Sequence, residues 1–302
     1  MKKNFSADNK SCVITVDVED WFQVENLRSA CPVNMWDNME LRVERNVNRL
    51  LELFSTLNIK ATFFVLGWIA KKVPGLIKKI HNHGHEIASH GFWHTICSKI
   101  PPDQLRKEIV SSKKLLEDIT GTRVLGFRAP NFSVTKELIQ CLKDFGYKYD
   151  SSYNSFKLNP RYGAVDQHEI KKNIDGIFEF DSGFYEVPIS NLEIKKIVFP
   201  AGGGAYFRIY PLFLFQLLIK YILHQKGWYL FYVHPWEIDP GQPKIKSLSI
   251  NHRFRHYINL DKTFERLKKI CYHFSSIEHI EFISCSELLN KKLFNNQKVS
   301  ET

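Results

Sequence analysis

Three carboxylates lie close together at Asp17, Glu19 and Asp20, where the mostly apolar run 11–18 ends. An apolar run of this length predicts a strand, whose two-residue period would place Asp17 and Glu19 on the same side. Concentrated negative charge is costly unless a cation or a proton compensates it. The cluster therefore indicates a cation site or, as the simpler alternative, a solvated loop with a helix-capping acid.

Two histidines, His90 and His94, lie at the end of the predicted strand 85–91 and just after it. A spacing of four residues allows one helical turn or a tight loop to direct both imidazoles at one metal ion. Imidazole binds zinc, cobalt, nickel and iron. The pair could be two ordinary polar residues, but together with one carboxylate it makes a three-ligand site with room for water.

His234 and Arg128 lie at the ends of two more predicted strands, 229–233 and 124–130. A histidine in this position can act as a general acid near neutral pH, and an arginine can orient a carboxylate through paired hydrogen bonds. The alternatives are a packed structural histidine and a surface ion pair. The glycine run 202–204 lacks the Lys-Ser/Thr of a phosphate loop and indicates only a flexible loop.

The elements that must position these residues are short apolar runs that alternate with amphipathic segments. Continuously apolar strands predict parallel pairing with both faces buried. About seven or eight strand–helix units favour a barrel, in which the carboxyl ends of all strands open onto one face. A doubly wound sheet would need a glycine-rich turn after the first strand, whereas residues 17–22 are acidic there. The predicted strands are 11–18, 61–67, 85–91, 124–130, 147–151, 185–190, 229–233 and 279–285.

Helices are predicted between these strands, with one long loop-like segment at 153–184. Asp103 is placed to cap the third helix, and Gly146 follows the fourth. The predicted helices are 40–57, 74–82, 103–119, 135–145, 211–224 and 261–274.

The chain has 302 residues and a net charge of +10, but its lysines are scattered in pairs. This pattern favours solvated helix faces, and no nucleic-acid recognition motif accompanies it, so we expect no nucleic-acid partner. The six cysteines form no C-x-x-C pair, which favours free buried thiols.

The N-terminus has positive charge without an apolar stretch, so we expect no secretory signal and a cytoplasmic protein. The most apolar stretch, 209–223, is short for a membrane span and predicts a buried or interfacial helix. Peripheral membrane contact through it is an open alternative, and the oligomeric state is left undetermined.

Taken in order, residues 15–22, 89–94, 128–130, 149–152 and 233–237 resemble the motifs of the polysaccharide deacetylase family, also called the NodB-homology or carbohydrate esterase 4 family. The resemblance is closest to a subgroup found beside bacterial exopolysaccharide genes, through residues 202–208, 234–240 and 251–257. It implies an α/β fold, a distorted (β/α)7–8 barrel of the NodB type, in a single catalytic domain. That domain would cover 11–290, between a flexible N-terminus at 1–10 and a flexible tail at 291–302.

The resemblance also implies roles for the clustered residues. Asp17 would be the general base and Arg128 would hold it, His234 would be the general acid, and His90 and His94 would bind the metal. The commonest family pattern has two adjacent aspartates, base then ligand, and this chain departs from it, so the third ligand would be Glu19 or Asp20. Glu19 is favoured because it shares the strand face of Asp17 and the subgroup resembles relatives with an Asp-x-Asp/Glu arrangement, and Asp20 is the alternative.

The implied activity is hydrolytic removal of the N-acetyl group from an N-acetylated sugar, with a divalent metal ion. Zinc is expected, and cobalt, nickel, manganese or iron are alternatives. Two other functions stay open: an amide or imide hydrolase acting on a small cyclic substrate, and an inactive carbohydrate-binding relative.

Pro130 and several aromatic residues near these motifs could line a sugar site by stacking on the rings. Packing in the core is the competing interpretation, because large aromatic side chains more commonly do that. The aromatic residues are Trp21, Phe22, Phe92, Trp93 and Trp236.

Overall fold

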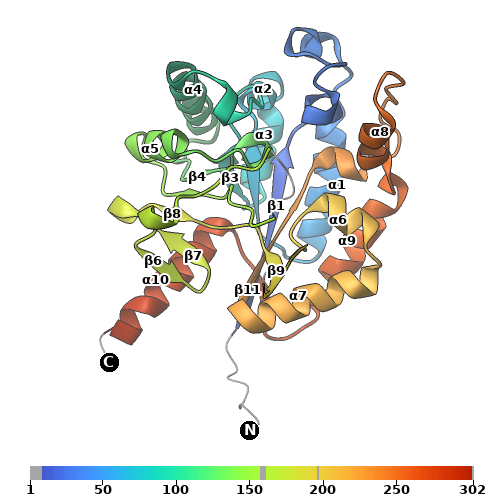
Figure 1. Cartoon of the computed structure of the whole chain (residues 1–302). Coiled ribbons are helices and arrows are strands. Elements are labelled where there is room, and N and C mark those ends of the chain that lie inside the picture. Colours follow the sequence, from blue (N-terminus) through green and yellow to red (C-terminus); the bar gives the residue numbers. More distant parts are fainter. Residues whose placement is uncertain (1–8, 157–160, 196, 301–302) are drawn as a thin grey trace.

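The computed structural model describes residues 9–156, 161–195 and 197–300, and its centre is a curled sheet of mostly parallel strands with helices outside it (Figure 1). The sheet order is β11-β1-β2-β3-β4-β5-β8-β7-β6, and neighbours from β11 to β8 are parallel. The sheet forms a curled half-barrel, which confirms the expected α/β fold of the NodB barrel type in a single domain. The parallel strands are β1 Lys10–Val18, β2 Ala61–Val65, β3 Glu86–Ser89, β4 Gly126–Phe127, β5 Tyr149–Asp150, β8 Tyr185–Glu186 and β11 Trp228–Val233, with β12 Ile280–Phe282 pairing beside β1.

The centre of the sheet is almost completely buried. Every side chain of β2 and β11 is buried, as is every side chain of β1 after Lys10. Parallel strands covered by helices have no solvated face, which is why these three runs are continuously apolar instead of alternating.

Amphipathic helices cover the outside of the sheet. For example, the apolar residues of α1 recur at helical spacing and are buried, whereas the residues between them face solvent. The helices are α1 Val43–Thr56, α2 Gly67–Lys72, α3 Pro74–Asn82, α4 Pro102–Thr120, α5 Lys136–Asp144, α6 Gly204–Ile209, α7 Leu212–Lys226, α8 Ile250–Tyr257, α9 Leu260–Ser275 and α10 Cys285–Ser300.

Several boundaries differ from the predictions. Asp103 does not cap α4, because the helix begins one residue earlier at Pro102, whose fixed φ suits the first helical position. The predicted loop 153–184 contains an antiparallel hairpin of β6 Lys172–Ile174 and β7 Ile177–Glu179. Residues 291–300, expected in the tail, continue α10, while 1–8 and 301–302 lie outside the described residues.

The gap between β8 and β11 is closed by the segment that contains a second hairpin, β9 Asn191–Ile194 and β10 Ile197–Pro200. The backbone amide of Leu230 donates to Ser190 Oγ at 2.8 Å, and the amide of Tyr232 donates to the carbonyl of Gly202 at 2.8 Å. A Cβ on Gly203 would lie 2.3 Å from the Tyr232 ring. The glycine run is therefore a place of close packing and not the flexible loop that the sequence indicated.

All six cysteines are buried and free, as expected. In the described part of the chain, no helix combines the length and the apolar character that crossing a membrane requires.

Candidate functional site

The predicted site residues meet where parallel strands end. Asp17 is the penultimate residue of β1, whereas His90, Arg128 and His234 each follow directly after β3, β4 and β11. The pairing Val16↔Val233 brings the end of β11 beside that of β1, and Ser89↔Phe127 joins β3 to β4. The strand ends therefore bring together groups that lie more than 200 residues apart in the sequence.

Glu19, His90 and His94 form a buried cluster, and one ligand atom from each lies within 4.8 Å of the other two. His94 Nε2 is 2.8 Å from Glu19 Oε2, and the two imidazole ring centres are 5.4 Å apart. Two imidazoles and one carboxylate make a donor set suited to a divalent transition metal.

His90 is held in one tautomer by the backbone. Its Nδ1 lies 2.8 Å from the carbonyl oxygen of Arg128, and because a carbonyl only accepts, Nδ1 must carry the proton. Nε2 is then the nitrogen with a free lone pair. Burial lowers the pKa of His90 to about 4, so the ring is neutral near neutral pH, as a metal ligand must be.

His94 reaches the cluster through a tight loop and not through a helical turn. Gly91 and His94 both have positive φ, at 74° and 52°, and these two bends reverse the chain after β3. Arg28 Nη2 donates to the carbonyl of His94 at 2.7 Å and fixes the end of the loop. Of the two arrangements that the spacing of His90 and His94 allows, a helical turn and a tight loop, the structure therefore has the tight loop.

The carboxylate of Glu19 is oriented from one side. Trp236 Nε1 donates to Oε1 at 3.1 Å, while the buried Oε2 accepts no hydrogen bond although His94 Nε2 is nearby. Burial alone would raise the pKa of Glu19, but His94 and His234 outweigh it and hold the pKa below its usual value. A buried, ionised oxygen without a hydrogen bond fits a residue that binds a cation.

Asp20, the alternative ligand, points elsewhere. Its side chain accepts hydrogen bonds from the backbone amides of Trp21, Arg42 and Val43 at 2.8, 2.7 and 2.8 Å. It thus joins the end of β1 to the beginning of α1, and it is not in the cluster of ligand atoms.

Asp17 is bound by Arg128, which is fully buried and donates from Nη1 to Asp17 Oδ1 at 2.7 Å. The other donors of the guanidinium bind Thr15 and Ser151, and its carbon lies 4.1 Å from the centre of the Phe64 ring. The guanidinium is therefore immobilised, and it fixes the Asp17 carboxylate through one oxygen.

His234 faces both carboxylates of β1. Its Nε2 lies 3.8 Å from Asp17 Oδ2 and 3.4 Å from Glu19 Oε1, and its Nδ1 lies 3.1 Å from Glu237 Oε2. Burial would lower the pKa of His234, but Glu19, Glu237 and Asp17 raise it to about 9. The imidazole is therefore a proton donor near neutral pH.

Glu237 and Arg208 also belong to the site, although the sequence predicted no role for either. The buried Glu237 carboxylate lies between His234 and Arg208, whose Nε is 3.2 Å from Oε1, and Oε2 also accepts from the His234 amide at 3.0 Å. Glu237 lies in the motif 233–237, and its position three residues after His234 signalled the contact between these two side chains. Arg208 lies in the segment 202–208, through which the chain resembles the exopolysaccharide subgroup, but nothing there signals its contact with Glu237.

Gly204 makes room for this carboxylate. A Cβ at position 204 would lie 2.0 Å from Glu237 Oε2, far inside van der Waals contact. The glycine is therefore required where α6 begins beside the end of β11.

The residues predicted to line a sugar site have differing environments. Trp21 is buried and donates to the carbonyl of Glu40, and Pro130 is buried and packs against Gly91. Trp93 is half-buried, with its ring 6.3 Å from that of Trp36.

Trp236 stacks between two histidines. Its ring is 5.3 Å from that of His234 and 4.5 Å from that of His256. Its observed contacts thus orient Glu19 and His234.

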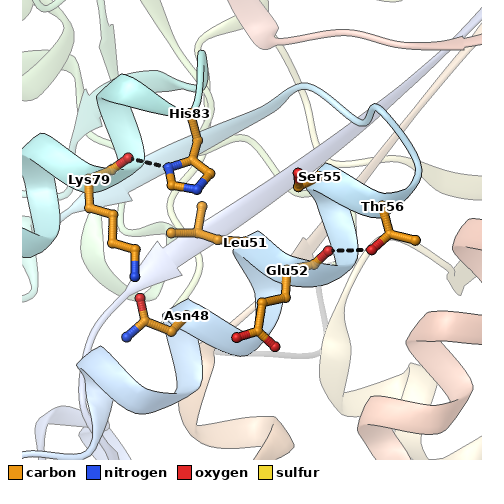
Figure 2. Close-up of a pocket in the computed structure, with 7 residues that line it drawn as sticks. All are labelled: Asn48, Leu51, Glu52, Ser55, Thr56, Lys79 and His83. Atoms are coloured by element: carbon orange, nitrogen blue, oxygen red, sulfur yellow. Dashed lines mark hydrogen bonds between the residues drawn. The ribbon is translucent and has the colours of Figure 1, made fainter.

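A separate surface cleft of about 290 Å³ lies between α1 and α3 (Figure 2). Polar and charged side chains line most of it, and it contains none of the predicted site residues. The lining residues are Asn48, Leu51, Glu52, Ser55, Thr56, Lys79 and His83.

Two family descriptions match the sequence. Residues 28–149 match "Polysaccharide deacetylase", and residues 151–290 match "Domain of unknown function (DUF3473)". Residues 28–149 therefore match the polysaccharide deacetylase family that the motifs of the sequence resemble. The finer assignment to an exopolysaccharide subgroup stays a prediction.

Curated relatives match part of the chain. A peptidoglycan deacetylase-like protein FGM2 of Gibberella zeae is 35% identical over 35% of this chain and 32% of its own length. A peptidoglycan-N-acetylglucosamine deacetylase of Bacillus cereus is 34% identical over 27% and 30%, and a peptidoglycan deacetylase of Helicobacter pylori is 30% identical over 40% and 42%. The matched segments thus cover less than half of each relative.

Solved structures of deacetylases share the fold. A Mycobacterium smegmatis protein assigned to the polysaccharide deacetylases superposes with a TM-score of 0.61 at 19% identity, covering 96% of this chain and 92% of that one. Peptidoglycan deacetylase PdaC of Bacillus subtilis gives a TM-score of 0.54 at 12% identity and covers 98% of both chains. At these identities the likeness concerns the fold alone.

Proposed function

We propose that this protein is a metal-dependent hydrolase that removes the N-acetyl group from an N-acetylated hexosamine in a glycan. The observation that carries the proposal is the convergence of the Glu19–His90–His94 cluster with Asp17 on one side and His234 on the other. The curated relatives are named as peptidoglycan deacetylases, which supports the substrate class. Zinc is the expected ion, because it favours sites with imidazole and carboxylate ligands and an open position.

A divalent ion held by Glu19, His90 and His94 would supply Lewis acidity toward the acetamide oxygen and toward water. Asp17 is the base in this proposal. Its Oδ1 is neutralised by Arg128, while Oδ2 faces His234 and the interior of the site and is left to take a proton from the attacking water.

His234 is the acid. Its Nδ1 is directed at Glu237, so the proton it can deliver to the leaving sugar nitrogen is the one on Nε2, on the side of Asp17 and Glu19. Cleavage of the C–N bond then gives acetate and a free amine. The base Asp17 lies on β1, and the acid His234 directly follows β11. Because these two strands are paired, the distance between base and acid is fixed by the sheet.

The test is acetate release from N-acetylglucosamine oligomers by the purified full chain, with and without excess chelator. Activity should disappear with the chelator and return when zinc is restored. Asp17→Asn and His234→Ala should each lower turnover by roughly 10²–10⁴-fold without unfolding the protein. Acetate release that is unaffected by the chelator would overturn the metal assignment, and near-normal turnover of either variant would exclude that residue.

A further inference from the structure

The sequence between Glu193 and Asp261 is nearly free of acidic residues. Only Glu237 and Asp239 interrupt it, and both are buried. The same stretch contains nine basic residues, at 195, 196, 208, 220, 226, 244, 246, 253 and 255. Arg208 is buried against Glu237, and the exposed Glu193 lies beside Ile194 in β9, so the surface that this stretch contributes has an excess of positive charge with one carboxylate next to it.

The outward face of α7, within this stretch, is apolar. Phe213, Leu217 and Tyr221 follow at intervals of four residues and are 66%, 57% and 47% exposed, and Leu214 beside them is 39% exposed. The opposite face is buried, so α7 has apolar residues on both sides. A helix on the surface of a globular protein normally places polar residues on the solvent side.

The β9–β10 hairpin adds apolar residues next to this helix. Ile194 and Ile197 are paired across the hairpin and are 46% and 62% exposed, and Phe199, two residues further on, is 40% exposed. β9 contacts α7, and the two elements lie beside each other at the lower right of the barrel (Figure 1).

These residues are concentrated and not scattered. Of the 16 large apolar residues exposed in the described part of the chain, eight fall within positions 194–221. Single exposed apolar residues are normal on a soluble protein, whereas a contiguous group marks an interaction surface. We define the α7 surface as Ile194, Ile197, Phe199, Phe213, Leu214, Leu217 and Tyr221.

We propose that the α7 surface binds peripherally to an anionic lipid bilayer. The exposed Lys220 lies on the same side of α7 as Phe213 and Leu217, and Lys195 lies in the turn between Ile194 and Ile197. Apolar side chains inserted at the level of the headgroups, with lysines beside them, match the requirements of a negatively charged membrane surface.

A second copy of the chain fits this surface less well. A two-fold interface would place the same patch on both sides, so Lys195 and Lys220 would face the same lysines of the other copy, and among β9, β10 and α7 only Glu193 offers an exposed carboxylate to pair with them. The anionic headgroups of a bilayer supply the missing negative charge.

The test is co-sedimentation of the full chain with vesicles of neutral phosphatidylcholine, with or without about 30% phosphatidylglycerol. Binding should require the anionic lipid and weaken as salt is raised from about 50 to 300 mM, because salt screens the lysines. The double variant Phe213→Ser/Leu217→Ser should bind at least about tenfold more weakly, because it removes two inserted side chains.

The matched control is Val33→Ser/Val110→Ser, which removes two exposed apolar side chains outside the α7 surface and should bind normally. Circular dichroism verifies that both variants fold. Absence of binding to anionic vesicles by the wild-type protein overturns the proposal. So does a wild-type dimer, detected by analytical ultracentrifugation, that Phe213→Ser/Leu217→Ser converts to a monomer.

Discussion

Replacing Gly204 by alanine should impair catalysis without touching a group that reacts. The new Cβ would lie 2.0 Å from Glu237 Oε2, so the carboxylate must move by about 1 Å or more to reach normal van der Waals contact. His234 Nδ1 is now 3.1 Å from that oxygen, and the displacement would break this hydrogen bond and weaken the ion pair with Arg208.

The expected fall in turnover follows from the loss of the hydrogen bond between His234 and Glu237. A hydrogen bond to a charged group contributes about 1.5–3 kcal/mol, and if all of it orients His234 in the transition state, turnover falls about 10- to 150-fold. KM should change little, because Glu237 binds His234 and not the substrate. Glu237→Gln should have a similar effect on turnover while leaving Gly204 in place.

The assay is steady-state acetate release, with thermal unfolding and metal content measured on the same samples. Gly75→Ala is the control, because a Cβ there meets nothing within 4 Å and alanine favours the helix. Turnover of Gly204→Ala within about threefold of wild type, in folded protein with its metal, would refute the role of Glu237 in positioning His234.

Three further outcomes are expected. His90→Ala should reduce bound metal from about one equivalent to under a tenth, measured by mass spectrometry of the purified protein, because one of three ligands is lost. Arg128→Met should lower the free energy of unfolding by about 3–5 kcal/mol in urea titrations, because the buried Asp17 loses its counter-charge, and adding Asp17→Asn should recover part of the loss. Burial and the neighbouring Asp150 raise the pKa of Glu186, so the contribution of Glu186 to stability should be largest below about pH 4.5 and be lost as pH rises above it, by up to about 1.4 kcal/mol per unit, whereas Glu19 and Glu237, whose pKa values are lowered, act in the opposite direction. Glu186→Gln should remove most of that dependence.

Each of the three predictions for His90, Arg128 and Glu186 would be contradicted by one specific result. Full metal content in His90→Ala would exclude this residue as a ligand, and His83→Ala, at the exposed end of α3, controls for loss of a histidine. Equal stability of Arg128→Met with and without Asp17→Asn would show that the carboxylate does not depend on the arginine. Parallel stability curves for wild type and Glu186→Gln between pH 5 and pH 7 would show that Glu186 is ionised in the folded protein.

Elements with a strong local pattern were predicted well. The strands at β1, β2 and β11 follow from continuous apolar runs, and α3 occupies the predicted range, Pro74–Asn82, because proline opens it and Gly84 follows its end. The strands β4, β5 and β8 are only two residues long, although longer runs were predicted. The length over which β4, β5 and β8 pair with their neighbours depends on how the sheet curls. The local sequence of a strand does not contain that information.

The sequence by itself determined which groups could react: the acidic cluster after the first strand, the histidines at 90 and 94, Arg128 and His234. Their types and their places at strand ends are local properties. Only the tertiary structure shows where the neighbouring carboxylates lie: Asp20 binds the amides that begin α1, while Glu19 lies against His94. It also decided that Gly204 and Arg208, on α6, hold Glu237 against His234. These contacts join residues about 30 positions or more apart, and they form only when packing brings α6 to the end of β11.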